Sequence, residues 1–114
     1  MLNGRNLVKE MSEKVLTEAI NETTTRKEIL DTATKYVCGQ REEDYGTPED
    51  NFNQISKLWN AYLGDNVTDA HDVAIMMSLL KVARIRTGRR KADSYIDLAG
   101  YAACGGEIAL KNNE

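Results

Sequence analysis

The amino-acid sequence predicts an all-α fold, a helical bundle of about five helices, and three observations support it. Apolar residues recur at intervals of three and four along most of the chain, the alternation typical of strands is scarce, and the 114 residues include one proline. The length suits a single domain whose core is modest, so a partner subunit is expected to add stability.

The first predicted helix covers about residues 6–20, where an apolar stripe lies opposite charged side chains. A lone short helix is marginal in water, so it must pack on the rest of the chain or on another subunit. We therefore expect residues 1–24 to form an appended amphipathic helix and residues 25–114 to form the all-α helical domain.

The next two helices have clear boundary signals. One is expected over residues 26–38, with Thr25 as its N-cap and a glycine after its last turn. The other begins at Thr47, has Pro48 in its first position and acidic residues behind it, and ends at Gly64.

The last two helices are expected over residues 68–87 and 92–111. The first of them is almost continuously apolar from Val73 to Ile85, which is typical of a central helix. The second is rich in alanine and glycine, which allow another backbone to come close. We expect a homo-oligomer formed through this small-residue face or through the N-terminal helix.

Composition argues against several classes of protein. The net charge of −3 and the pI near 5.2 argue against a nucleic-acid-binding surface, which is normally basic. Cys38 and Cys104 form no metal-binding pair, and His71 is the single histidine, so a structural zinc site is not expected. We expect two buried free thiols in a reducing compartment. With no signal-peptide or membrane-spanning pattern, the predicted location is the cytoplasm.

Charged residues embedded in the last two helices form the first candidate site. The short connection between these helices favours an antiparallel hairpin, and counting from the turn places Lys81 near Asp97 and Arg84 near Asp93. One interpretation is a pair of structural ion pairs. The other is a pocket in which Asp93 and Asp97 hold Mg²⁺ while the two cations hold phosphate oxygens. The cost of placing charges among apolar residues favours the second.

A second candidate site is the polar run over residues 40–52. Arg41 offers a planar fork of donors for phosphate, Tyr45 can stack on a base, and Asp44 or Glu43 can supply a further carboxylate. Asn51 lies in the first turn of the helix that follows. The alternative is a well-capped connection between two helices.

Other polar and aromatic residues have simpler interpretations. Asp69 and Asp72 lie in the first turn of a helix, where carboxylates are favoured, so capping is expected rather than metal binding. His71 beside them is expected to be solvated. Trp59 is expected to be a core or interface residue first and a base-stacking surface second.

Several motifs together resemble a small all-α family that is widespread in bacteriophages and prophages. The motifs are residues 41–52 (REEDYGTPEDNF), 58–59 (LW), 72–77 (DVAIMM), 80–84 (LKVAR) and 93–101 (DSYIDLAGY). The resemblance covers about residues 26–110.

More distantly, the chain resembles the MazG-like all-α nucleoside triphosphate pyrophosphohydrolases. This resemblance implies hydrolysis of a nucleotide to its monophosphate and pyrophosphate, with Mg²⁺ held by acids on neighbouring helices of a dimer or tetramer. The chain departs from that group's Glu-Glu-x-x-Glu and Glu-x-x-Asp signatures. Lys81 and Arg84 stand where glutamates are expected, and Asp93 and Asp97 are four residues apart rather than three.

These residues and resemblances are compatible with three functions. The first is a Mg²⁺-dependent nucleotide pyrophosphohydrolase, and its predicted residues fall into three sets. The catalytic set is Asp93, Asp97 and Lys81; the metal ligands are Asp44, Asp93 and Asp97; the nucleotide-binding residues are Arg41, Tyr45, Asn51, Trp59, Lys81 and Arg84. The second is a non-catalytic protein that binds a nucleotide or other phosphorylated small molecule, or inhibits a host protein. The third is a structural oligomer in which the ion pairs fix the register.

Overall fold

The computed structural model describes residues 24–112, apart from the side chains of Gln40, Arg41 and Asn112. The helix predicted over residues 6–20 lies outside the described residues. The elements are α2 (Arg26–Cys38), α3 (Gln40–Tyr45), α4 (Pro48–Leu63), α5 (Ala70–Thr87) and α6 (Ala92–Asn112). No strand occurs within residues 24–112, so the predicted all-α class is confirmed.

The helix boundaries follow the capping residues. The Thr25 hydroxyl accepts a hydrogen bond from the backbone N–H of Glu28, and the Thr47 hydroxyl accepts one from the backbone N–H of Asp50, both at 3.2 Å. Gly64 ends α4 in the left-handed conformation, at φ 77°. The short helix α3 differs from the prediction, which places these residues in a connection between two helices.

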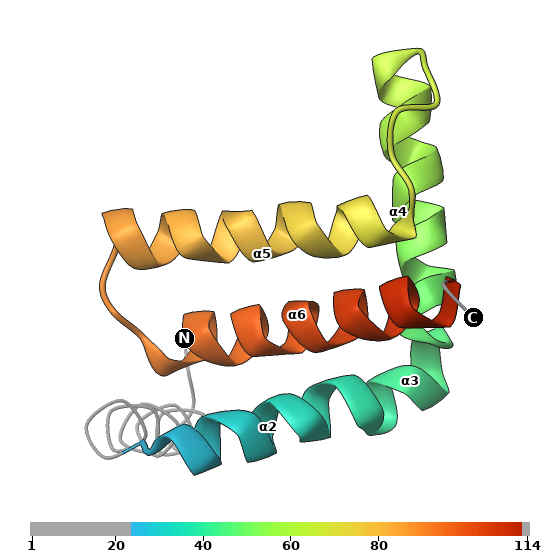
Figure 1. Cartoon of the computed structure of the whole chain (residues 1–114). Helices are drawn as coiled ribbons and strands as arrows, with labels where there is room; N and C mark the ends of the chain where they lie inside the picture. The colour runs from blue at the N-terminus through green and yellow to red at the C-terminus, as the bar shows by residue number, and fades with distance from the viewer. Residues whose placement is uncertain (1–23, 113–114) are drawn as a thin grey trace, which may run out of the picture.

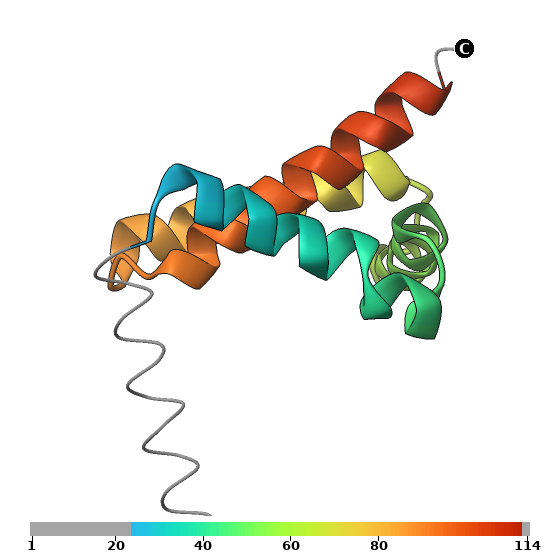
Figure 2. The same cartoon turned by 90° about the horizontal axis from the view of Figure 1, so that it is seen from below.

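The helices form one layer with a crosswise helix at its end. Helices α5 and α6 make the predicted antiparallel hairpin, and α2 packs on α6 (Figure 1). Figure 2 shows α4 nearly end-on while the other long helices run lengthwise, so α4 crosses the end of this layer.

The loop between α4 and α5 is fixed by side-chain hydrogen bonds. The Asn60 amide donates to the backbone carbonyl of Thr68 and accepts from its backbone N–H, both at 2.9 Å. The buried Ser56 hydroxyl donates to the same carbonyl at 2.7 Å. These bonds satisfy the polar groups of the loop and fix where α5 begins.

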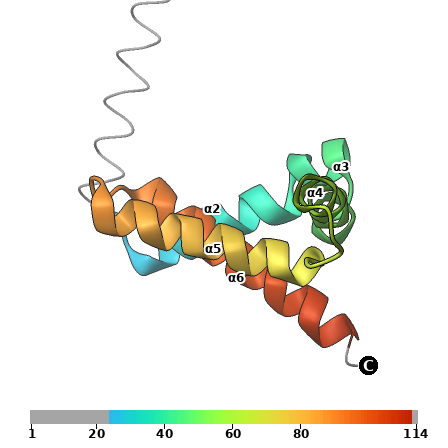
Figure 3. The ribbon, with the colours of Figure 1, turned by 90° about the horizontal axis from the view of Figure 1, so that it is seen from above.

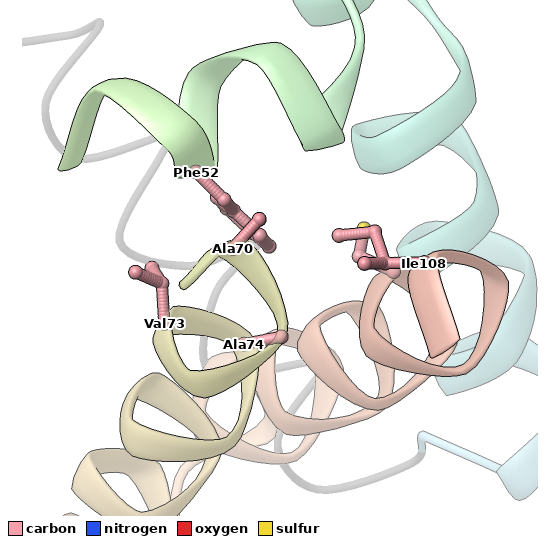
Figure 4. Close-up of a cluster of buried hydrophobic side chains, with 6 residues drawn as sticks. Phe52, Ala70, Val73, Ala74 and Ile108 are labelled. Atoms are coloured by element: carbon pink, nitrogen blue, oxygen red, sulfur yellow. The ribbon is translucent and has the colours of Figure 1, made fainter. Parts of the chain in front are cut away.

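The core lies where α4, α5 and α6 meet. It consists of Phe52, Ala70, Val73, Ala74, Cys104 and Ile108 (Figure 4). A Cβ atom on Gly105 would lie 3.1 Å from the Cβ of Ala74, so α5 and α6 are in close contact there. A Cβ atom on Gly100 would lie 3.1 Å from Val37 Cγ1 on α2. These two glycines therefore allow close contacts between helices of the same chain.

Two burial predictions are wrong. Helix α5 was expected to be central, but it buries one face only and exposes Ile75, Met76, Leu79, Leu80 and Val82 on the other. Cys38 is exposed, whereas Cys104 is buried as expected.

Among the described residues, no helix combines the length and the apolar character that crossing a membrane requires.

Candidate functional site

A cavity of about 580 Å³ lies between α2, α3, the first turns of α4, and α6. Its volume falls in the range of small-molecule sites, about 300–1,000 Å³. It lies on the opposite side of α6 from α5, because α2 and α5 pack on different faces of α6 (Figure 1).

The cavity exists because small residues line two helices and because the chain reverses beside them. Ala33 on α2 and Gly100 on α6 both line it, and neither fills the space with a long side chain. The reversal occurs at Gly46, whose φ of 83° favours glycine. Its backbone N–H donates to the carbonyl of Glu42 at 2.8 Å. This turn brings the end of α3 to the cavity.

Aromatic side chains line both the floor and the rim. Phe52 is buried and lies next to Tyr101, with ring centroids 6.1 Å apart and an interplanar angle of 37°. Tyr36 and Tyr45 also line the cavity but are 54% and 70% exposed. Aromatic faces in such an arrangement suit a flat ring, which can pack between floor and rim.

Asp97 brings a fixed carboxylate to the cavity wall. Its Oδ2 lies 2.9 Å from Nζ of Lys81, whose side chain is buried, whereas the Asp97 side chain is 33% exposed. The predicted register of the hairpin is therefore confirmed at this pair. Both interpretations of the pair have a basis here, because the two charges neutralise each other and the carboxylate still lines a cavity.

The structure brings some of the predicted residues together and separates others. Asp44, Tyr45, Asn51 and Asp97 all line the cavity. Lys81 reaches it only through Asp97.

The remaining predicted residues lie elsewhere. Arg84 and Asp93 are exposed, and the ion pairs of the described residues do not join them. Trp59 packs against the core and does not line the cavity. The side chain of Arg41 lies outside the described part of the chain, although its backbone belongs to α3.

The three acids predicted as metal ligands do not form a cluster. Within residues 24–112, the close group of three metal-ligating side chains is Asp69, His71 and Asp72. The two carboxylates of that group are used in capping. Asp69 accepts from the backbone N–H of Asp72 at 2.9 Å, and Asp72 accepts from the backbone N–H of Asp69 at 3.0 Å. The predicted capping role is confirmed.

Five polar or aromatic residues that line the cavity are absent from the predicted site. They are Lys35, Tyr36, Glu42, Phe52 and Tyr101. For Tyr36 and Tyr101 a local signal exists. Tyr36 lies three residues after Ala33 and Tyr101 follows Gly100, and these small residues leave room beside a larger neighbour.

The comparisons with known proteins find relatives in bacteriophages. The chain is 41% identical to the Gene 55 protein of Mycobacterium phage D29 over 76 residues, which cover 67% of this chain and 50% of that protein. It is 40% identical to the Gene 55 protein of Mycobacterium phage L5 over 86 residues, which cover 75% of this chain and 55% of that protein. The chain thus spans about half the length of these curated relatives.

No solved structure gives a significant match to the chain. A family model, described as a domain of unknown function (DUF6378), matches residues 28–109. That span contains the helices α4, α5 and most of α2 and α6, and with them every residue of the cavity. The predicted resemblance to a small phage family is therefore confirmed, and the chain belongs to the DUF6378 domain family.

Proposed function

We propose that the chain binds a nucleoside or nucleotide in the cavity between α2, α3 and α6. The observation that supports this most directly is the aromatic floor and rim beside the carboxylate of Asp97, which Lys81 holds in place. A flat base would pack against the rings, and a fixed carboxylate would accept hydrogen bonds from base amino or ribose hydroxyl groups.

The charge of the cavity favours contact with the base and sugar rather than with bare phosphate. Its charged lining residues are three acids, Glu42, Asp44 and Asp97, and one base, Lys35. Phosphate oxygens would be repelled by the acids unless they extend out of the cavity or carry a divalent cation. The proposal is therefore binding without catalysis, in which a nucleotide or related signal is sequestered.

Magnesium-dependent pyrophosphohydrolysis is a second candidate, supported by the position of Asp44 and Asp97 on one cavity. Mg²⁺ often takes one or two carboxylates, with substrate phosphates and water as its other ligands. Asp44 and Asp97 fit that partial set and would hold the ion, which would neutralise phosphate charge and activate a water molecule. This second proposal also implies that the helices are arranged as in the MazG-like pyrophosphohydrolases.

A ligand panel separates these proposals. Thermal unfolding of the whole chain is measured with nucleosides and nucleotides, each with and without Mg²⁺, because a bound ligand raises the apparent stability. Pyrophosphate release is assayed in the same samples. A raised Tm without release supports binding alone, whereas release supports the hydrolase. If no member of the panel raises the Tm or is hydrolysed, both proposals are wrong.

A tyrosine variant then tests the place of binding. We expect Tyr45→Ala to weaken the binding of the ligand that the panel identifies by about tenfold, because loss of a stacking ring costs about 1–3 kcal/mol. Tyr62→Ala is the matched control, since Tyr62 is also strongly exposed but lies on α4 away from the cavity. Titration calorimetry gives both affinities, and equal losses in the two variants would contradict this site.

A further inference from the structure

One face of α5 is apolar and is left uncovered by the other described helices. It carries five large apolar side chains: Ile75, Met76, Leu79, Leu80 and Val82. Leu79, at the centre, is 61% exposed. Figure 3 looks down on this side and shows α5 in front of α6 and α2, with none of these described helices over it. A continuous apolar patch of this kind on a small protein marks an interaction surface.

The sequence of this face is arranged symmetrically about Leu79. Asp72 and Arg86 lie seven residues before and after it, two helical turns away on the same face. Between them, Met76 and Val82 lie three residues from the centre. Along the helix from its N-terminus, this face therefore presents an acidic residue, an apolar residue, the central leucine, a second apolar residue and a basic residue.

That order matches an antiparallel copy of itself and no parallel one. In an antiparallel pair centred on Leu79, Asp72 lies opposite Arg86 of the second copy, and the apolar residues lie opposite one another. A parallel pair would instead place acid on acid and base on base. The ion pairs within the described residues leave Arg86 unpaired, so this charge is available to a partner.

We infer that two copies of the chain associate through α5, antiparallel and two-fold symmetric, with Leu79 beside Leu79 of the second copy. A contact related by a two-fold axis uses the same patch on both subunits, which is what the symmetric order of this face provides.

Helix α4 enlarges the surface available to the second copy. It extends past α5 on the side away from α6 (Figure 1) and exposes Leu58 and Tyr62. Because α4 stands at the N-terminal end of α5, it would border the C-terminal end of the second copy's α5. A stable dimer buries about 800 Å² on each partner, more than one helix face supplies, and α4 adds to it.

The first test is the oligomeric state of the full chain, measured by sedimentation equilibrium. We expect the wild-type chain to be a dimer and Leu79→Glu to weaken self-association about a hundredfold or more, because like charges would meet on the two-fold axis. Leu110→Glu is the matched control, since Leu110 is similarly exposed but lies on α6, and it should leave the dimer intact. The circular dichroism of both variants should match the wild type, because both positions are exposed.

The second test is a disulfide across the axis. In a Cys38→Ser background, which removes the exposed natural thiol, Leu79→Cys should form a covalent dimer on mild oxidation, whereas Leu110→Cys should not. If the wild-type chain is a monomer, the inference is wrong, and the exposed face of α5 would be covered by another segment or by another protein. A dimer that survives Leu79→Glu and fails to cross-link at residue 79 would overturn it as well.

Discussion

Among the described residues, Lys81 is the charged residue that is buried, and its pairing with Asp97 is unequal. The Lys81 side chain has little contact with water, whereas the Asp97 side chain is one-third exposed. Removal of Asp97 would therefore leave a buried charge without a partner, whereas removal of Lys81 would leave a charge that is partly exposed to solvent. A buried ammonium group without a counter-charge is costly, but a partly exposed carboxylate can be hydrated.

This inequality predicts an order of stability for two variants. We expect Asp97→Ala to lower the free energy of unfolding by about 2 kcal/mol, since it leaves the ammonium group of Lys81 buried and unpaired. We expect Lys81→Met to lower the free energy of unfolding by about 1 kcal/mol or less. Methionine fills much of the same space, and the partly exposed Asp97 carboxylate can still be hydrated by solvent. Urea unfolding followed by circular dichroism measures both.

The alternative is that the pair acts as a surface ion pair. Both variants would then cost under about 1 kcal/mol, as exposed pairs do, and their order would not be fixed. A larger loss in Lys81→Met than in Asp97→Ala would contradict the argument from burial.

At the scale of helices, two adjacent glycines on α6 are predicted to respond oppositely to alanine. A Cβ atom on Gly105 would lie 3.1 Å from the Cβ of Ala74, which is fully buried and fixed to the backbone of α5. The two helices would have to separate slightly, which we expect to cost about 1 kcal/mol net after the gain in helix propensity. A Cβ atom on Gly106 would meet nothing within 4 Å, so Gly106→Ala should stabilise by about 0.5–1 kcal/mol.

The Tm of the two variants relative to wild type checks this prediction, since they differ by one position on the same helix. Stabilisation by Gly105→Ala would show that α5 yields easily at Ala74, and would contradict the close contact described above. Destabilisation by Gly106→Ala would place a neighbour against the face that the described structure leaves open.

Helix boundaries could be predicted from the sequence because their signals are local. A threonine N-cap and a glycine after the last turn each act within one helical turn, and the structure confirms Thr25, Thr47 and Gly64 in these roles. Helix α3 could not be predicted in this way, because its six residues contain no apolar repeat.

The candidate site could be predicted only in part, for a related reason. Asp97 and Lys81 are joined by the register of a short hairpin, which can be counted from the turn. The cavity itself depends on how α2 lies against α6, a contact between segments more than fifty residues apart in the chain. Nothing in the local sequence places Tyr36 of α2 on the same cavity as Tyr101 of α6. The interpretation of Trp59 as a core residue required only helical spacing and agrees with the structure.

At the scale of the whole molecule, α5 shows why an apolar helix was misassigned. A helix that is apolar on all sides must be covered on all sides, and the sequence cannot state which chain covers it. Within the described residues, α4 and α6 cover one face, and five large apolar side chains remain exposed on the other. The expectation of a central helix is met only if the second face is covered by another copy.

A covered α5 predicts that stability depends on protein concentration. Two folded chains that associate are stabilised by mass action, so the Tm of the wild-type chain should rise as the total concentration is raised a hundredfold. In the Leu79→Glu variant the Tm should be lower and should not change with concentration, because the dimer no longer forms. Scanning calorimetry at several concentrations measures both chains. A wild-type Tm that is constant over this range, at concentrations where sedimentation detects the dimer, would mean that association adds little stability, and the exposed face of α5 would then not be completing the core.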